Sequence, residues 1–144
     1  MKGSGERGKE LVFERVRFAY DGGMAFALND FSAGFSPGEV TALLGPNGSG
    51  KTTMMKLANR RLAPALGRVL YGGRPLGELT RREVGQSIGF VPQSERIAFD
   101  YSILDYVLMG RAPWLSPLAA PGRADADIAA EAIEEVGLTS LIRR

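Results

Sequence analysis

The stretch Gly45-Pro46-Asn47-Gly48-Ser49-Gly50-Lys51-Thr52-Thr53 decides the fold of this 144-residue chain. It fits the pattern G-x-x-x-x-G-K-[ST], in which a glycine-rich loop follows a strand and opens a helix. Glycines let successive backbone N–H groups turn inward, and the helix directs its positive N-terminal end at the same point. The stretch therefore predicts a loop that holds the phosphate groups of a nucleotide.

Two side chains of the loop supply further parts of this chemistry. Lys51 adds a full positive charge that can reach the β- and γ-phosphates, and the hydroxyl of Thr52 is placed to coordinate Mg²⁺. A plain glycine-rich turn with a surface lysine is the alternative interpretation. The context favours the phosphate loop, because an apolar run at residues 40–44 precedes it and a helical pattern follows it.

The sequence around the loop predicts strands and a helix. Residues 11–20 alternate between apolar and polar side chains, and further short strands are expected at residues 25–35, 40–44, 69–71 and 88–91. The run 40–44 is apolar throughout, as expected of a strand that is buried on both faces. After the loop, helical spacing places four apolar residues on one face and a proline stops the helix: Met54, Leu57, Ala58, Leu62 and then Pro64.

The last third of the chain has an all-helical pattern. Helices are expected at residues 79–84, 102–110 and 126–136, of which the last two form this all-α part. Asp125 or Asp127 can cap the final helix, and Gly137 can end it. The chain is therefore α/β at the front and helical at the back. The arginine pair Arg60 and Arg61 is expected to lie on the solvated surface.

Composition excludes several kinds of site. The chain has no cysteine and no histidine, which rules out disulfides, Cys/His zinc sites and Ser-His or Cys-His catalysis within it. The net charge of +2 is too balanced to indicate nucleic-acid binding. No stretch approaches the ~20 apolar residues that cross a bilayer, so a membrane role is expected to depend on a partner.

The phosphate loop resembles the Walker A loop of ABC-transporter ATPase subunits, and two other positions agree with that family. Tyr20 closes the first predicted strand 25 residues before Gly45, where the family has an aromatic residue that stacks on adenine. Gln93 follows the apolar strand 42 residues after Lys51 and resembles the glutamine that reaches Mg²⁺ and the attacking water and senses the membrane partner. Each residue alone would be an ordinary strand-terminal side chain.

A subfamily resemblance comes from residues 106–114. They look like the helical-subdomain stretch of ATPases that drive the import of iron-siderophore, haem or cobalamin complexes. An amphipathic helix that simply packs is the compatible alternative, with Trp114 as a core or interface aromatic. The resemblance divides the chain into a flexible lead-in at 1–10, a nucleotide-binding α/β part at 11–93 and the start of a helical subdomain at 94–144.

The resemblance covers only the first half of the family's domain. It implies a P-loop NTPase core with an antiparallel β subdomain, truncated before the signature motif. LSGGQ, the Walker B aspartate, the catalytic glutamate and the switch histidine are absent from the sequence. Negligible hydrolysis by this chain alone is therefore expected, because phosphoryl transfer also needs a second acidic metal ligand and a group that positions water. The missing strands would leave apolar surface around Leu43, Ile88 and Phe90 partly uncovered.

For the full-length parent, the resemblance implies an ATPase that binds ATP and Mg²⁺ between two head-to-tail copies. Its expected partners are integral membrane permease subunits, which dock around residues 93–111, and indirectly a periplasmic or extracellular solute-binding protein, but no nucleic acid. The expected location is the cytoplasmic face of the membrane, as a peripheral subunit.

Other interpretations stay open at this point. A GTPase would need D-x-x-G and N-K-x-D, which are absent, and kinases typically lack the placements of Tyr20 and Gln93. Two further alternatives remain. One is a DNA-repair or translation module of the same ATPase class, and the other is an inactive truncated product.

Overall fold

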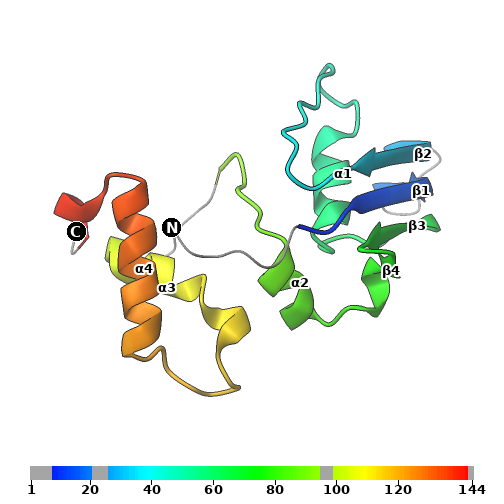
Figure 1. Ribbon diagram of the computed structural model, residues 1–144. Helices are drawn as coiled ribbons and strands as arrows, with labels where there is room; N and C mark the ends of the chain where they lie inside the picture. The colour runs from blue at the N-terminus through cyan, green and yellow to red at the C-terminus, as the bar shows by residue number, and fades with distance from the viewer. Residues whose placement is uncertain (1–7, 21–25, 95–98, 143–144) are drawn as a thin grey trace. The chain divides into compact units, whose positions relative to one another are not determined.

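The computed structural model describes residues 8–20, 26–94 and 99–142. The chain forms two compact units, the first ending at Gly89 and the second beginning at Phe90 (Figure 1). The first unit contains β1 (Leu11–Phe18), β2 (Leu28–Phe35), α1 (Lys51–Ala58), β3 (Leu66–Tyr71), β4 (Arg74–Pro75), η2 (Leu76–Glu78) and α2 (Arg81–Ser87). The second contains α3 (Ile103–Met109), η3 (Ala112–Trp114), α4 (Arg123–Glu135) and η4 (Thr139–Leu141).

An antiparallel sheet is the frame of the first unit. Its strand order is β2-β1-β3-β4, so β1 is hydrogen-bonded on both sides. The predicted strand at 11–20 is confirmed for Leu11–Phe18, but its alternation is interrupted. Phe13 and Val16 are both buried although they differ in parity, because the register with β2 shifts between them, where Arg15 has a φ of 46°. Phe13 pairs with Ala33 of β2 and Val69 of β3, and this register directs the apolar face of the sheet toward α1.

The core of the first unit lies between α1 and this sheet (Figure 1). Met54 and Leu57 of α1 are buried with Phe13 in one apolar cluster, as their predicted helical spacing requires. The Phe13 ring meets the rings of Phe31 and Phe35 edge-on, with centroids 5.5 and 6.0 Å apart. Such edge contacts add to the burial of apolar area. The helix that follows the phosphate loop is therefore anchored to β1 and β2.

The end of α1 differs from the prediction. The helix ends at Ala58, six residues before the expected stop at Pro64. Arg60 has a positive φ of 58° and its guanidinium donates to the carbonyls of Gly77, at 2.9 Å, and of Leu79. The prediction that Arg60 is merely solvated is therefore wrong, because it connects the end of α1 to η2 and to the start of α2.

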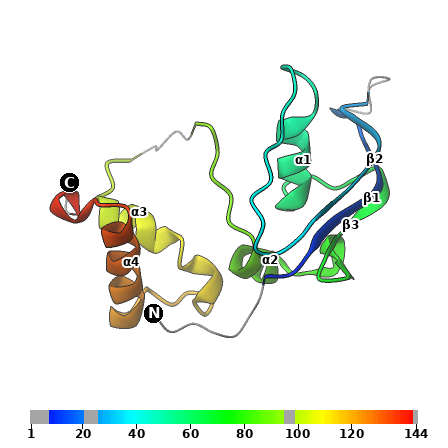
Figure 2. The same cartoon turned by 45° about the horizontal axis from the view of Figure 1, so that its top comes forward.

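Two predicted strands are absent from the described residues. The apolar run 40–44 forms no strand, and Val40 and Leu44 are 103% and 89% exposed. The run 88–91 also lacks strand structure, and Val91 is exposed. A doubly buried strand needs hydrogen-bonded neighbours, and the described sheet offers none to either run. Figure 2 shows the segment between β2 and α1 as an extended arm without a strand arrow.

The sequence predicts a helix in the region of α2, but both of its ends differ from the prediction. The prediction of a helix at 79–84 is shifted, because α2 runs from Arg81 to Ser87. Its start is fixed by a capping box: the Glu83 N–H donates to the Thr80 hydroxyl at 3.1 Å, and the Thr80 N–H donates to the Glu83 carboxylate at 2.6 Å. Hydrogen bonds from the backbone and the side chain of Thr80 stabilise the charged carboxylate and lower the pKa of Glu83.

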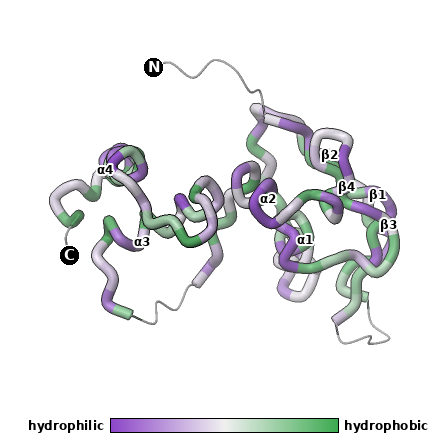
Figure 3. The backbone as a smooth tube through the Cα atoms, turned by 90° about the horizontal axis from the view of Figure 1, so that it is seen from below, coloured by the Kyte–Doolittle hydropathy of each residue, from purple (hydrophilic) through white to green (hydrophobic). Residues whose placement is uncertain are grey.

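The second unit is built on α3 and α4, whose residues are in contact. Both hydrophilic and hydrophobic residues occur in α4 (Figure 3), and Ala129 and Ile133 are buried. The Ser102 hydroxyl accepts the Asp105 N–H at 3.1 Å and caps α3. Both predicted helices are thus confirmed, although α4 begins three residues earlier than expected. No helix within the described ranges combines the length and apolar character needed to cross a bilayer.

Asp125 joins the start of α4 to the preceding turn. Its carboxylate accepts the Gly122 N–H at 3.1 Å and the Arg111 Nε at 3.0 Å. The Arg111 guanidinium also lies over the Trp114 ring, 4.7 Å from its centroid. Because the Arg111 and Gly122 donors stabilise the charged form, the pKa of Asp125 lies below its ordinary value of 3.8.

This pKa shift gives a pH-dependent stability. Ionised Asp125 favours the folded state above pH 3.8, and that contribution is lost as the pH falls through the lowered folded pKa. The variant Asp125→Asn should therefore unfold more easily than wild type at neutral pH, and the difference should disappear as the pH falls through the lowered folded-state pKa of Asp125. Thermal unfolding followed by the fluorescence of Trp114 measures this. Asp127→Asn, which removes an exposed carboxylate from the same helix, is the matched control; an equal loss in both variants would contradict the prediction.

Candidate functional site

The loop that precedes α1 has the backbone conformation that a phosphate cradle needs. Gly48 and Gly50 have φ angles of 81° and 89°, in the left-handed region that glycine adopts without cost. A Cβ atom at Gly48 would meet nothing within 4 Å, so the backbone there is open to a ligand. A Cβ atom at Gly50 would lie 2.5 Å from the Ala27 carbonyl and 2.8 Å from Leu28. Gly50 therefore also lets the loop lie directly against β2.

Lys51 folds back over the loop. Its Nζ donates to the carbonyls of Gly45 and Pro46, both at 2.6 Å, and to the Ser49 hydroxyl at 3.3 Å. These three acceptors match the three N–H bonds of the ammonium group. The positive charge is consequently held at the centre of the loop, where an anion would enter.

The first turn of α1 adds backbone N–H donors without a side-chain cap to the phosphate loop. Gly50 is the N-cap and has no side chain to cap the helix, and no acidic residue lies in the first turn. The early N–H groups of a helix lack partners within the helix, and its N-terminus carries partial positive charge. Thr52, in this turn, is exposed, so its hydroxyl is accessible to a ligand. The geometry fits a polyanion and a cation that accompanies it.

The structure brings Tyr20 to the same helix. Its hydroxyl lies 3.1 Å from the Thr53 hydroxyl, and its ring meets Phe18 edge-on with centroids 4.9 Å apart. Sequence reasoning placed Tyr20 near the loop but missed its contact with Thr53. The available signal was a hydroxyl on the inner face of the helix, four residues before the buried Leu57, since a buried hydroxyl needs a partner.

Gln93 belongs to the second unit, where it is exposed. Its predicted role at Mg²⁺ stays a prediction, as does that of Thr52. Within the described residues, no group of three or more acidic, histidine or cysteine side chains could hold a metal ion. The predicted contacts of a magnesium ion at this loop are Thr52 and Gln93, together with phosphate and water oxygens.

A hollow of about 140 Å³ opens beside the loop. Ser49, Gly50 and Lys51 line one side of it, and apolar residues line the rest, namely Leu28, Phe31, Leu43, Leu44 and Met54. Leu43 also packs against the core cluster. The predicted partly uncovered surface around Leu43 thus lies directly behind the phosphate loop.

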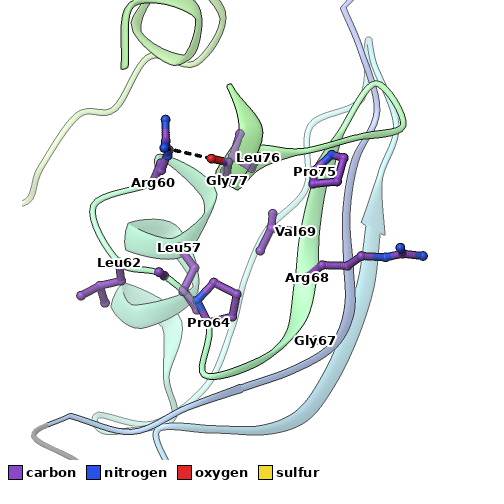
Figure 4. A pocket seen from close by; sticks show the side chains of 11 residues that line it. Leu57, Arg60, Leu62, Pro64, Gly67, Arg68, Val69, Pro75, Leu76 and Gly77 are labelled. Atoms are coloured by element: carbon purple, nitrogen blue, oxygen red, sulfur yellow. Dashed lines mark hydrogen bonds between the residues drawn. The ribbon is translucent and has the colours of Figure 1, made fainter. Parts of the chain in front are cut away.

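A second hollow, of about 350 Å³, lies away from the loop at the end of α1 (Figure 4). Leu57, Leu62 and Pro64 form one side, and Val69 and Pro75 face them from β3 and β4. Its arginines are already paired, because Arg60 binds backbone carbonyls and Arg68 binds Glu14 at 2.5 Å. Both arginines of this hollow are therefore engaged in contacts within the first unit.

Comparison with known proteins gives a consistent result. The profile of the ABC transporter family matches residues 28–144. The chain is 35% identical over 137 residues to the chelated iron transport system membrane protein YfeB of Yersinia pestis, with 94% of this chain and 45% of that protein covered. It is 46% identical over 89 residues to the ATP-dependent lipid A-core flippase of Cupriavidus pinatubonensis, with 61% of this chain and 15% of that protein covered.

A solved structure gives the same fold. The chain aligns with a candidate metal-chelate type ABC transporter in an inward-facing conformation, with a TM-score of 0.75 and 31% identity. The alignment covers 95% of this chain and 48% of that one. The predicted fold class, α/β with an antiparallel β part and a helical part, is confirmed. The chain spans less than half the length of each of these three proteins.

Two of the three loop glycines, Gly48 and Gly50, give a matched pair of substitutions. Both have positive φ, but only Gly50 faces a backbone atom at clashing distance. We expect Gly48→Ala to lower the free energy of unfolding by about 1–2 kcal/mol, the cost of a left-handed alanine. Gly50→Ala should cost about 1–3 kcal/mol more, because the helix must move away from Ala27. Urea unfolding measures both, and equal losses would show that the contact with β2 is unimportant.

Proposed function

The chain belongs to the ABC transporter family, and we propose that it supplies the ATP-contacting part of a transporter that couples ATP hydrolysis to import of a metal-chelate type solute. The observation that carries the proposal is the Lys51 ammonium held at the centre of a glycine loop that opens α1. The proposed solutes are iron-siderophore, haem or cobalamin complexes.

The loop would hold ATP by its phosphates. Lys51 exchanges contacts with the Gly45 and Pro46 carbonyls for contacts with phosphate oxygens, which are charged and therefore stronger acceptors. Backbone N–H groups of the loop and of the start of α1 point to the same charge. Tyr20 is proposed to stack on the base, and Thr52 and Gln93 to contact Mg²⁺. The metal would neutralise charge on the phosphates during transfer.

Hydrolysis needs groups that this sequence does not contain. The chain has no histidine and no LSGGQ segment, and no apolar strand in it ends in an acidic pair. We propose that these groups belong to a longer parent protein that pairs head-to-tail with a second copy, and that this chain alone has negligible ATPase activity. Permease subunits would dock around residues 93–111 at the cytoplasmic face, with a solute-binding protein acting through them.

Support for the solute class comes from relatives. The protein YfeB is described as part of chelated iron transport, and the aligned structure as a metal-chelate type transporter. The similarity to a lipid A-core flippase supports the ATPase part of the proposal but not the solute. A DNA-repair or translation module of the same ATPase class is the alternative. Two assays separate these proposals. A transport subunit co-purifies with an integral membrane protein, whereas a repair module shifts a DNA band in a gel.

The loop lysine gives the direct test of function. In the full-length protein, Lys51→Ala should weaken ATP binding by at least about tenfold, since a hydrogen bond to a charged group contributes about 1.5–3 kcal/mol. Solute import should be lost as well. Lys56→Ala, on the same helix, is the control and should bind ATP like wild type. Unchanged ATP affinity and import in Lys51→Ala would refute the proposal.

Uptake assays test the solute class separately. Cells that lack the gene should accumulate less radiolabelled iron-siderophore, haem or cobalamin than cells that carry it, and the deficit should be restored by wild type but not by Lys51→Ala. The reason is that import against a gradient needs the hydrolysis step that Lys51 supports. Normal uptake of all three complexes in the deletion strain would reject this solute class while leaving ATP binding by the protein untouched.

A further inference from the structure

Thr53 is the last residue of the stretch that is predicted to hold the nucleotide. The pattern ends at Thr52, whose side chain is exposed, whereas Thr53 is only 5% exposed. Thr53 is the one buried polar or charged residue in the part of the chain that the structure describes. A buried hydroxyl without a partner is costly, so its contact is informative. That contact is the Tyr20 hydroxyl, 3.1 Å away.

Tyr20 is consequently held at both ends of its side chain. Its hydroxyl is fixed by Thr53, and its ring is fixed by the edge of Phe18, with ring planes at 89°. The side chain is nevertheless 46% exposed, so part of it is available for contact. An exposed tyrosine without such contacts would exchange between rotamers, and ordering it on binding would reduce affinity.

We infer that Thr53 is a positioning residue that presets the Tyr20 ring for the base of the nucleotide. The inference rests on the proposed function, in which Tyr20 stacks on the base. Thr53 lies two residues after Lys51 in α1, so one helix turn fixes both the ammonium that meets the phosphates and the ring that meets the base. The two ends of the nucleotide site are thereby held at a constant separation before ligand arrives.

Four variants of the full-length protein test this role. Thr53→Val keeps the shape of the side chain and removes the hydroxyl, and Tyr20→Phe keeps the ring and removes the other hydroxyl. Thr53→Ser keeps the hydroxyl, and Thr53→Val with Tyr20→Phe completes a double-mutant cycle. Equilibrium binding is measured for ATP with Mg²⁺ and for tripolyphosphate with Mg²⁺, which has the phosphates but no base.

We expect each single loss of a hydroxyl to weaken ATP binding by about two- to tenfold, the range for one neutral hydrogen bond. The double variant should bind no more weakly than either single one, Thr53→Ser should be close to wild type, and Tyr20→Phe should leave tripolyphosphate binding unchanged. An unchanged ATP affinity in Thr53→Val overturns the inference, as does an equal loss for ATP and tripolyphosphate in Tyr20→Phe, or an additive double variant. Failure of wild type to bind ATP at all would instead refute the proposed function, and with it the inference.

Discussion

The absence of a side chain at residue 50 is the constraint on which the nucleotide site depends. The space that a Cβ atom would take is already filled by the Ala27 carbonyl and by Leu28, at the start of β2. Because Gly50 is also the N-cap of α1, this close approach fixes where the helix begins relative to the sheet. Leu57, about two turns further along, then lies in the cluster around Phe13. Loop, helix and sheet are therefore positioned by one backbone contact.

The parts that sequence reasoning predicted well depend on neighbours within a few residues. The β-rich composition of β1, the helical spacing in α1 and the glycine at 137 are local patterns, which can be read from the sequence without knowledge of the fold. The alternation in β1 is the exception, because a register shift buries both Phe13 and Val16. The phosphate loop is the clearest local pattern, because the glycines within it determine its backbone conformation. Tyr20 was singled out by a family resemblance, but its contact with α1 was not predicted.

The parts that were predicted wrongly depend on distant partners. Residues 40–44 and 88–91 have the apolar composition of central strands, but a strand exists only where other strands bond to it. The apolar composition of a segment indicates how much free energy its burial would contribute. It does not show whether neighbouring strands are present to form hydrogen bonds with it. The early end of α1 has a similar cause, because the carbonyls that bind Arg60 come from residues 77 and 79. The Tyr20–Thr53 contact likewise joins residues 33 positions apart.

The contrast between β1 and the run at 40–44 has a dynamic counterpart. The amides of β1 lie between two hydrogen-bonded strands, so they exchange their protons with solvent only when the sheet opens. Val40 and Leu44 are apolar but open to water, and their amides have no such protection from a ladder in the described sheet. Deuterium uptake would thus distinguish two kinds of hydrophobic segment that hydropathy alone treats as equal.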